Sequence, residues 1–402
     1  MHVELHPNLK HTPVGERAAQ LTSACVHCGF CLATCPTYLD NRDERDSPRG
    51  RIYLIKQLLE TDQAGAATQL HLDRCLTCRS CETTCPSGMQ YGELLDISRD
   101  LVEQRVPPRF SEKTTRRLLR YILSSPRLFK GALHIGQFLR PLMPAALRAK
   151  VPAKQQVKKV PAANRQQKML LLEGCVQQAA TPATNNAARR VLDKLGISLI
   201  AMPRAGCCGA LNYHLAAHAD GLDDIRRNID AWWASIEAGA EAIVSSASGC
   251  GVMLADYGQL LEHDSAYAVK AARVSQLARD IGQVLCSENL GALAVNTDIG
   301  EVAVQTPCSL QHGLQQPSLI TDILKRAGFS LAKTQDEHLC CGSAGTYSIL
   351  QADTSERLRE KKIKALTSDK PAVIASGNVG CQLHLQAAAD IPVVHWIELL
   401  DS

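Results

Sequence analysis

Apolar and polar positions follow one pattern in the N-terminal part of the chain and another in the C-terminal part. Apolar residues recur at helical spacing between residues 51 and 59, directly after Ser47 and Pro48. Serine can cap a helix and proline fits its first turn, so this stretch is predicted to be helical. We therefore expect residues 21–100 to form a mainly helical domain, preceded by a polar arm over residues 1–20.

The C-terminal part alternates short apolar runs with longer helical segments. Runs that predict strands occupy residues 169–175, 197–202, 242–244, 301–305, 329–331 and 372–374. Helices are predicted over 181–195, 222–237 and 319–327, and Gly196 and Gly328 can close two of them in the left-handed conformation. This alternation is typical of parallel α/β units, whose sites form beyond the carboxyl ends of the strands.

The 402 residues include 17 cysteines, and eight of these form two identical patterns near the N-terminus. Each quartet is C-x2-C-x2-C-x3-C-P, and the second repeats the first 50 residues later. The quartets are Cys25, Cys28, Cys31, Cys35 and Cys75, Cys78, Cys81, Cys85. A chain without a secretory signal keeps thiols reduced, so this density indicates metal or redox chemistry rather than disulfides.

The spacing within each quartet is that of a two-cluster ferredoxin. In such proteins the fourth cysteine of each quartet binds the opposite cluster. The sequence therefore predicts two [4Fe–4S] clusters, one on Cys25, Cys28, Cys31 and Cys85, the other on Cys75, Cys78, Cys81 and Cys35. The alternative is two zinc sites in a scaffold protein, although zinc favours well-separated C-x2-C pairs. Clusters with four cysteine ligands leave no position for a substrate, so we predict one-electron transfer and no catalytic residues here.

The other cysteines form a second repeat. Cys-Cys-Gly occurs twice, 133 residues apart, with a single cysteine before and after each pair. These eight are candidate ligands of a further cluster or metal, although buried thiols or a reversible disulfide are alternatives: Cys175, Cys207, Cys208, Cys250, Cys308, Cys340, Cys341 and Cys381. Gly209 and Gly342 would allow a close backbone approach. Cys286 has no counterpart and is predicted to be a small core residue.

These patterns predict a multidomain α+β protein. A helical ferredoxin-type domain (21–100) precedes a connector (101–168) and two tandem α/β cysteine-rich units (169–290 and 300–402). Residues 101–170 hold 16 lysines and arginines but only two acidic residues, Glu103 and Glu112. This stretch is either a solvated linker or a docking surface for anionic lipid or an acidic partner. Nucleic acid is disfavoured, because only 4% of residues are aromatic.

Several motifs are missing from the sequence. We find no G-x-G-x-x-G after a predicted strand and no G-x4-G-K-[ST], so neither a flavin, a nicotinamide nor an ATP site is evident. No apolar run is long enough to predict a transmembrane helix. A redox protein that acts on an organic substrate needs a two-electron carrier, so the sequence implies a partner that has one.

Two ferredoxin quartets, a basic connector and two Cys-Cys-Gly units together resemble the iron–sulfur subunits of bacterial glycolate oxidase. The resemblance extends over essentially the whole chain. It includes the local strings at Cys25–Cys31, Cys35–Tyr38, Ser47–Ile52 and Cys81–Gly88. More distantly, the chain is similar to lactate-utilisation proteins, the small subunit of anaerobic glycerol-3-phosphate dehydrogenase and the cysteine-rich subunits of heterodisulfide reductases.

The resemblance implies a complex in which partner subunits carry FAD and oxidise glycolate to glyoxylate. This chain would pass the electrons towards quinone, as a cytoplasmic protein peripheral to the inner membrane. D-Lactate, glycerol 3-phosphate or heterodisulfide chemistry is the alternative. The sequence departs from heterodisulfide reductases, whose units hold five cysteines, because Ala247 and Asn378 replace one cysteine in each half. The non-cubane cluster of those relatives is therefore not expected.

Overall fold

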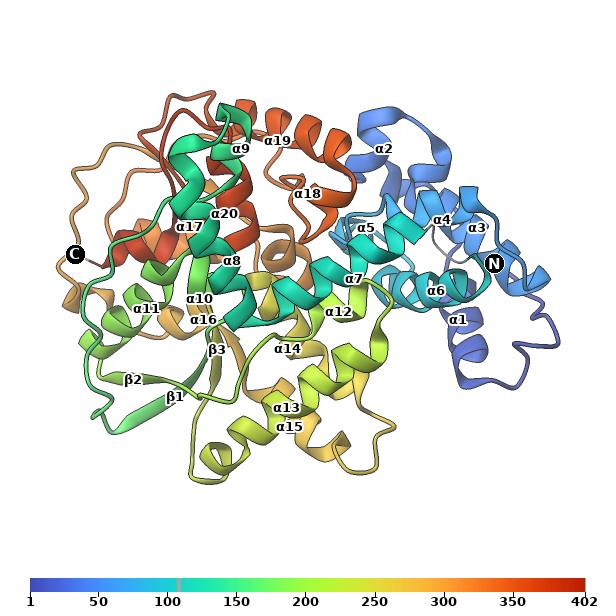
Figure 1. Cartoon of the computed structure of the whole chain (residues 1–402), viewed down its shortest axis with the longest axis horizontal. Helices are drawn as coiled ribbons and strands as arrows, with labels where there is room; N and C mark the ends of the chain where they lie inside the picture. The colour runs from blue at the N-terminus through green and yellow to red at the C-terminus, as the bar shows by residue number, and fades with distance from the viewer. Residues whose placement is uncertain (107–109, 402) are drawn as a thin grey trace.

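The computed structural model describes residues 1–106 and 110–401 and contains helical and α/β parts (Figure 1). The N-terminal part is helical throughout. Its helices are α1 (Pro13–Ser23), α2 (Pro36–Asn41), α3 (Pro48–Thr61), α4 (Ala66–Asp73), α5 (Ser80–Thr83) and α6 (Tyr91–Arg105), with 3-10 turns at Phe30–Leu32 and Glu44–Asp46. The predicted ferredoxin-type domain is thus helical, as the sequence indicated.

Helix α3 begins as its sequence predicts. The Ser47 side chain accepts a hydrogen bond from the Gly50 amide at 2.9 Å, and Pro48 occupies the first turn. Gly50 is required, because a Cβ there would lie 2.0 Å from the carbonyl oxygen of Glu44. The helix buries Ile52, Ile55, Leu58 and Leu59 in the core of this domain.

Residues 1–20 differ from the expected polar arm. Leu9, Ala18 and Leu21 are buried in the same core as helix α3. Thr12 caps helix α1 by accepting a hydrogen bond from the Gly15 amide. Leu9 precedes α1 and Ala18 lies on it, and although Val14 of α1 is exposed, these buried residues make the segment part of the domain.

The basic connector is helical as well. It forms α7 (Phe110–Ser124), α8 (Pro126–Leu139), a 3-10 turn (Arg140–Leu142) and α9 (Ala145–Lys150). In Figure 1 these helices form a teal-to-green band across the middle of the molecule. The connector is therefore a folded layer over the other parts and not an open linker.

The first cysteine-rich unit, as we name the part from β1 to α16, contains a parallel four-stranded sheet. The strand order is β2-β1-β3-β4. Its strands are β1 (Gln167–Leu172), β2 (Ile197–Ala201), β3 (Ile243–Ser245) and β4 (Ala278–Asp280). Its helices are α10 (Gln177–Ala180), α11 (Pro182–Lys194), α12 (Ala210–His214), α13 (His218–Glu237), α14 (Ser248–Leu260), α15 (Ala268–Leu277) and α16 (Ile281–Cys286).

The second cysteine-rich unit, from β5 to the C-terminus, contains a parallel three-stranded sheet in the order β5-β6-β7. Its strands are β5 (Val302–Gln305), β6 (Val373–Ser376) and β7 (Val393–His395). Its helices are α17 (Leu319–Arg326), α18 (Tyr347–Leu350), α19 (Ala352–Leu366) and α20 (Val379–Gln386), with a π-helical turn at Ser309–Gly313 and 3-10 turns at Leu290–Ala292, before β5, and Trp396–Leu400.

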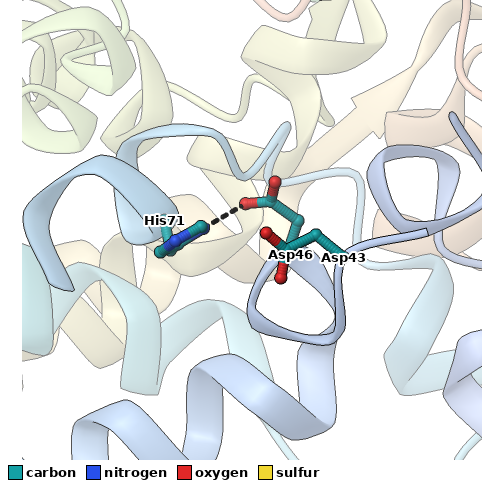
Figure 2. A group of neighbouring side chains, drawn as sticks. All are labelled: Asp43, Asp46 and His71. Carbon is teal, nitrogen blue, oxygen red and sulfur yellow. Dashed lines mark hydrogen bonds and ion pairs between the residues drawn. The ribbon is translucent and has the colours of Figure 1, made fainter. Parts of the chain in front are cut away.

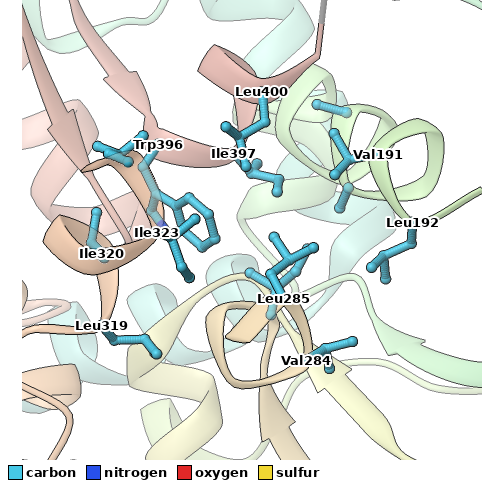
Figure 3. Close-up of a cluster of buried hydrophobic side chains, with 14 of the residues drawn as sticks. Val191, Leu192, Val284, Leu285, Leu319, Ile320, Ile323, Trp396, Ile397 and Leu400 are labelled. Atoms are coloured by element: carbon cyan, nitrogen blue, oxygen red, sulfur yellow. The ribbon is translucent and has the colours of Figure 1, made fainter. Parts of the chain in front are cut away.

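The two units share one apolar core. Along β1, Met169 and Leu171 face this core, whereas Leu170 and Leu172 face a cluster on the other side of the first sheet. The strands of the second sheet alternate in the same way, with Val302 among the residues of the shared core. Figure 3 shows the meeting point, where Val191, Leu192, Val284 and Leu285 of the first unit lie beside Trp396, Ile397 and Leu400 of the second.

Cys286 is not the core residue that the sequence predicted. Helix α16 buries Ile281, Val284 and Leu285, which recur at helical spacing on one face. Cys286 lies on another face of the helix and is exposed. Within the described residues, we find no helix of the length and apolar character needed to cross a membrane.

Candidate iron–sulfur site

Two loops of the helical domain carry the eight cysteines of the ferredoxin pattern, and both have the same backbone shape. His27 and Gly29 in the first loop have left-handed φ values of 55° and 84°. Thr77 and Arg79, at the equivalent positions of the second loop, have φ values of 53° and 57°. A β-branched residue such as threonine rarely adopts this conformation, so the fold maintains strain here. A left-handed residue in each C-x2-C segment curls the loop and allows its cysteines to converge.

The cysteines of the two loops lie close enough for their charges to interact across the domain. Burial raises the pKa of Cys25, and the neighbouring Cys85 of the other loop raises it further. Burial likewise raises the pKa of Cys81, with added effects from Cys78, Cys75 and Cys35. The exchange of the fourth cysteine between quartets stays a prediction, since Cys35 acts on Cys31 of its own loop as well.

The donor set fits two iron–sulfur clusters. All eight cysteines are free thiols in the structure, so none is used in a disulfide. Burial raises the pKa of Cys31 to about 11. A thiol of that kind stays protonated at neutral pH unless a bound metal takes the place of its proton. The two loops therefore supply eight free thiols, and at Cys31 a bound metal would supply the ionisation that burial disfavours.

A buried network of charges supports these loops. Asp46 is fully buried and binds Arg51 at 3.4 Å, Arg74 at 3.2 Å and His71 at 2.8 Å. Figure 2 shows Asp46, His71 and the nearby Asp43, whose ligand atoms lie within 4.8 Å of one another. Because both carboxylate oxygens of Asp46 already pair with cations or the imidazole, we interpret this group as an ion-pair network rather than a metal site. No pattern in the sequence signalled that an arginine would be buried here.

The second set of cysteines lines one large cavity, with a volume of about 790 Å³. Every repeated cysteine follows the carboxyl end of a strand or bridge, as the sequence predicted. Two cysteines of the ferredoxin-type domain, Cys75 and Cys78, also line this cavity. All eight repeated cysteines belong to its lining: Cys175, Cys207, Cys208, Cys250, Cys308, Cys340, Cys341 and Cys381. The cavity thus joins both thiol sets in one space.

The glycine of each Cys-Cys-Gly motif is required by the backbone. Gly209 has φ of 94° and Gly342 has φ of 88°, both in the left-handed region. A Cβ at Gly209 would lie 2.8 Å from the Gly221 carbonyl oxygen, and one at Gly342 would lie 2.6 Å from that of Ser355. Another backbone segment lies close to each of these glycines, as the sequence predicted. The segment is a helix of the same unit.

The positions that lack a fifth cysteine differ between the units. Ala247 precedes helix α14 in the first unit and is buried. Asn378 precedes helix α20 in the second, and its amide nitrogen donates to the Cys381 sulfur at 3.6 Å. Its side-chain oxygen also accepts a hydrogen bond from the Gly249 amide of the first unit, at 3.4 Å. Asn378 therefore links the two thiol groups.

Polar contacts fix the ferredoxin-type domain on the cysteine-rich units. Arg79 pairs with Asp256 of the first unit at 2.7 Å. Thr83 is hydrogen-bonded to His312 of the second unit at 2.9 Å. Asp40 pairs with two cations of helix α19, Arg357 at 2.6 Å and Lys361 at 2.7 Å. The second cysteine loop is therefore held directly over the cavity.

The histidines near the cysteines have ordinary partners. His214 pairs with the buried Asp96 at 3.0 Å, and His218 stacks on Tyr213. His312 bonds Thr83 and the His338 carbonyl oxygen, while His384 bonds Ser355. Asp96 had no sequence signal, because its role depends on a partner 118 residues away.

Comparison with known proteins agrees with these sites. Residues 24–90 match the family described as "4Fe-4S dicluster domain", and residues 169–255 and 302–386 match "Cysteine-rich domain". The chain is 48% identical over 403 residues to the "Glycolate oxidase iron-sulfur subunit" of Escherichia coli (strain K12), covering 100% of this chain and 99% of that relative.

Other relatives are more distant. The "Probable glycolate oxidase iron-sulfur subunit" of Bacillus subtilis (strain 168) is 28% identical and covers 94% of this chain and 92% of its own length. "Lactate utilization protein A" of Bacillus velezensis is 26% identical over 58% of this chain and 99% of its own length. Given the full-length match to the Escherichia coli protein, the chain belongs to the family of glycolate oxidase iron-sulfur subunits.

Proposed function

We propose that this chain is the electron-transfer subunit of a flavin-dependent complex that oxidises glycolate to glyoxylate and passes electrons towards quinone. The observation that carries the proposal is the meeting of Cys75 and Cys78 with both Cys-Cys-Gly groups at one cavity. FAD would be bound by partner subunits, because this sequence has no evident dinucleotide motif. The relative's name, glycolate oxidase iron-sulfur subunit, supports the substrate.

The eight ferredoxin-type cysteines would hold two [4Fe–4S] clusters, in the two sets predicted from their spacing. A bound cluster of this type accepts and releases one electron at a time. The residues of the chain position it: Arg99 donates hydrogen bonds to the carbonyl oxygens of Leu72 and Cys75, both at 2.9 Å. The Thr77 amide donates to the Cys75 sulfur at 3.4 Å. These contacts hold the second loop in shape on the cavity side.

The Cys-Cys-Gly thiols would form a further metal or cluster site. In the second unit, the Cys308 thiol donates to Cys340 at 3.8 Å. Burial raises the pKa of Cys78, and the neighbouring charge of Cys308 adds to the effect. A site in the second unit would therefore lie beside the second ferredoxin loop, where it could extend the path of the electrons.

The test uses the complex purified without oxygen together with its partner subunits. Replacement of Cys78 by serine should abolish most quinone reduction while glycolate still reduces the flavin of the partner. Cys286→Ser is the matched control, because Cys286 is exposed and outside both cysteine sets. Iron analysis should give about eight irons per chain, or more if a Cys-Cys-Gly group is loaded. Full quinone reduction by Cys78→Ser would contradict the proposal, and zinc in place of iron would favour a scaffold.

D-Lactate is the second candidate substrate. It is favoured by the similarity to "Lactate utilization protein A", which covers 58% of this chain. Rates of flavin reduction by glycolate and by D-lactate, measured on the same complex, separate the two candidates.

A further inference from the structure

The connector turns apolar side chains outward. More than half of the large apolar side chains that are exposed in the described residues belong to residues 118–160. Side chains elsewhere on the surface of a soluble domain are exposed singly, whereas a concentration of this kind marks an interaction surface. The exposed apolar residues of the connector are Leu118, Tyr121, Leu128, Ile135, Phe138, Leu139, Leu142, Leu147, Val157 and Val160.

Helix α8 carries the clearest part of this surface. Leu128, Ile135, Phe138 and Leu142 are separated by seven, three and four residues, which places them on one face of the helix and of the turn that follows. Ile135 is 63% exposed, and Phe138 and Leu142 are each 83% exposed. A helix that packs on a soluble domain normally turns its apolar face inward. In α8 only Leu133 is buried.

Unpaired cations border this apolar face. Arg127, Lys130 and Arg148 are exposed and have no ion-pair partner within the described part of the chain. Arg116 and Arg120 of helix α7 instead pair with Asp73 and Asp220, which fixes the connector to the rest of the protein. The outer side of the connector is therefore both apolar and basic, with few acidic residues to repel an anionic surface.

We propose that helices α7, α8 and α9 form a docking surface for an anionic lipid bilayer, with Phe138 and Leu142 inserted between the headgroups. Exposed apolar side chains flanked by lysine and arginine are characteristic of helices that lie in a membrane interface. Basic residues gain from the negative potential of the lipid surface, which gives the complementary charge.

The docking surface adds a membrane contact to the proposed function. It rests on that function only for the identity of the membrane electron acceptor. The cavity that holds both cysteine sets is bordered by Arg116 and Leu123 of α7 and by Lys150 of α9. Docking through these helices would bring that border of the cavity close to the bilayer. A lipid-soluble acceptor would then meet the protein beside its thiol sites.

The test is flotation of the purified, cluster-loaded chain with vesicles. Vesicles of phosphatidylglycerol and phosphatidylcholine should bind the chain, and those of pure phosphatidylcholine should bind it weakly. The double variant Phe138→Ser, Leu142→Ser should bind about tenfold more weakly or worse, because the inserted side chains are lost. Val269→Ser is the matched control, since Val269 is 82% exposed on helix α15 and lies outside the connector. Equal binding by the double variant and the control would overturn the proposal.

A second measurement does not require a variant with weaker membrane binding or lower stability. Phe138→Trp should shift its fluorescence to shorter wavelength on addition of anionic vesicles and be quenched by brominated lipids. Val269→Trp should show neither change. If Phe138→Trp also stays unquenched, or if the serine variants lose the partner subunits but keep vesicle binding, the face contacts protein and the proposal is wrong. If the complex with its partner subunits binds vesicles but does not oxidise glycolate, the docking surface stands and the proposed function is refuted.

Discussion

The four thiols of the first cysteine-rich unit and the four of the second line the same cavity, yet their neighbours differ. In the first unit, hydrogen bonds from Cys175 and Cys208 hold the pKa of Cys207 well below its ordinary value. In the second unit, the pKa of the equivalent Cys340 lies well above its ordinary value, because the hydrogen bond to Cys341 and burial outweigh the hydrogen bond from Cys308. The repeat has therefore kept the number and position of the thiols while their environments have diverged.

The position of the ferredoxin-type domain explains much of this difference. The second unit lies against the second cysteine loop, where Leu76 and Cys78 pack with Cys340 and Tyr347. Charged pairs join the domain to both units, Arg79–Asp256 and His214–Asp96 in the first and Asp40 with Arg357 and Lys361 in the second. An apolar contact brings thiol sites close, whereas the charged contacts orient the domain. We infer that the second unit is the one placed to exchange electrons with the ferredoxin-type domain.

The shared core is the feature whose loss should have the largest effect. Trp396 belongs to the second unit, is 1% exposed and packs against residues of both units (Figure 3). Replacement by alanine should lower the free energy of unfolding by about 3–5 kcal/mol, because it leaves a large cavity. In urea, both units should unfold in a single transition. Trp233→Ala, at a partly buried position of the first unit outside this core, is the control, and two separate transitions would contradict a common core.

A change of pH should alter the free energy of unfolding through one buried group in each unit, and the two effects have opposite signs. Burial lowers the pKa of His395 to about 4, and its ring donates to the Ser246 carbonyl oxygen of the first unit at 2.7 Å. Its folded pKa lies below the unfolded value, so the stability that it contributes is present above about pH 6.5 and is lost as the pH falls towards 4. Between pH 8 and pH 5 this group should account for about 2 kcal/mol of lost stability.

The opposing group is Asp280, whose pKa burial raises to about 7. Its folded pKa lies above the unfolded value of 3.8, so its contribution to stability decreases as the pH rises from about 4 to 7. His395→Gln should therefore reduce the loss of stability on acidification, and Asp280→Asn should increase the net loss. Thermal unfolding at pH 8 and pH 5 gives the comparison, and identical pH profiles for both variants would refute it.

Much of this arrangement follows from the sequence, but only at the level of single elements. The short apolar runs at residues 169–175 and 301–305 predict β1 and β5, and Gly196 and Gly328 end helices at φ of 85° and 92°. Strands β4 and β7 have three residues each and neither was predicted: β4 has no apolar pattern, and Val393 and Val394 of β7 form too short a run. The run at 329–331 forms only a single bridge, between Leu331 and Val302.

The candidate site was predictable where spacing alone specifies chemistry. The two quartets and the Cys-Cys-Gly motifs carry their own ligand sets, whereas the cavity that joins them depends on how three folded parts pack. The apolar residues of a strand do not indicate which other element will pack against them. The core shared by the two units was therefore not predicted. Arg51 is similar: its burial depends on Asp46 and on the His71 carbonyl oxygen, which other elements supply.

The glycines of the two Cys-Cys-Gly motifs should differ in their tolerance of a side chain. Alanine at either position is strained by the left-handed backbone, at a cost of about 1–2 kcal/mol. Gly342→Ala should cost more than Gly209→Ala, since its Cβ would lie 2.6 Å rather than 2.8 Å from a backbone carbonyl oxygen. Urea unfolding of both variants measures the difference, with Gly65→Ala as the control at an unobstructed site. A smaller loss at Gly342 would contradict this ranking.

Asn378 provides the smallest and most local test of the difference between the units. Its amide donates to the Cys381 sulfur, whereas Ala247 has no side-chain donor for Cys250 of the first unit. Asn378→Ala should lower the free energy of unfolding by only about 0.5–1.5 kcal/mol, because the two hydrogen bonds that it removes are long, 3.6 Å to Cys381 and 3.4 Å from the Gly249 amide. The substitution also removes the amide that contacts the Cys381 sulfur, so it should alter the reactivity of that thiol.

Alkylation of the metal-free protein, followed by mass spectrometry, tests this expectation at single residues. The alkylation rate of the Cys381 thiol should differ between Asn378→Ala and the unmodified chain, because the amide that contacts its sulfur is lost. Cys250 is the internal control, since it lies in the same cavity but does not bond Asn378. If both thiols change rate equally, the substitution has altered access to the cavity as a whole. The divergence between the units would then lie in their surroundings and not in this hydrogen bond.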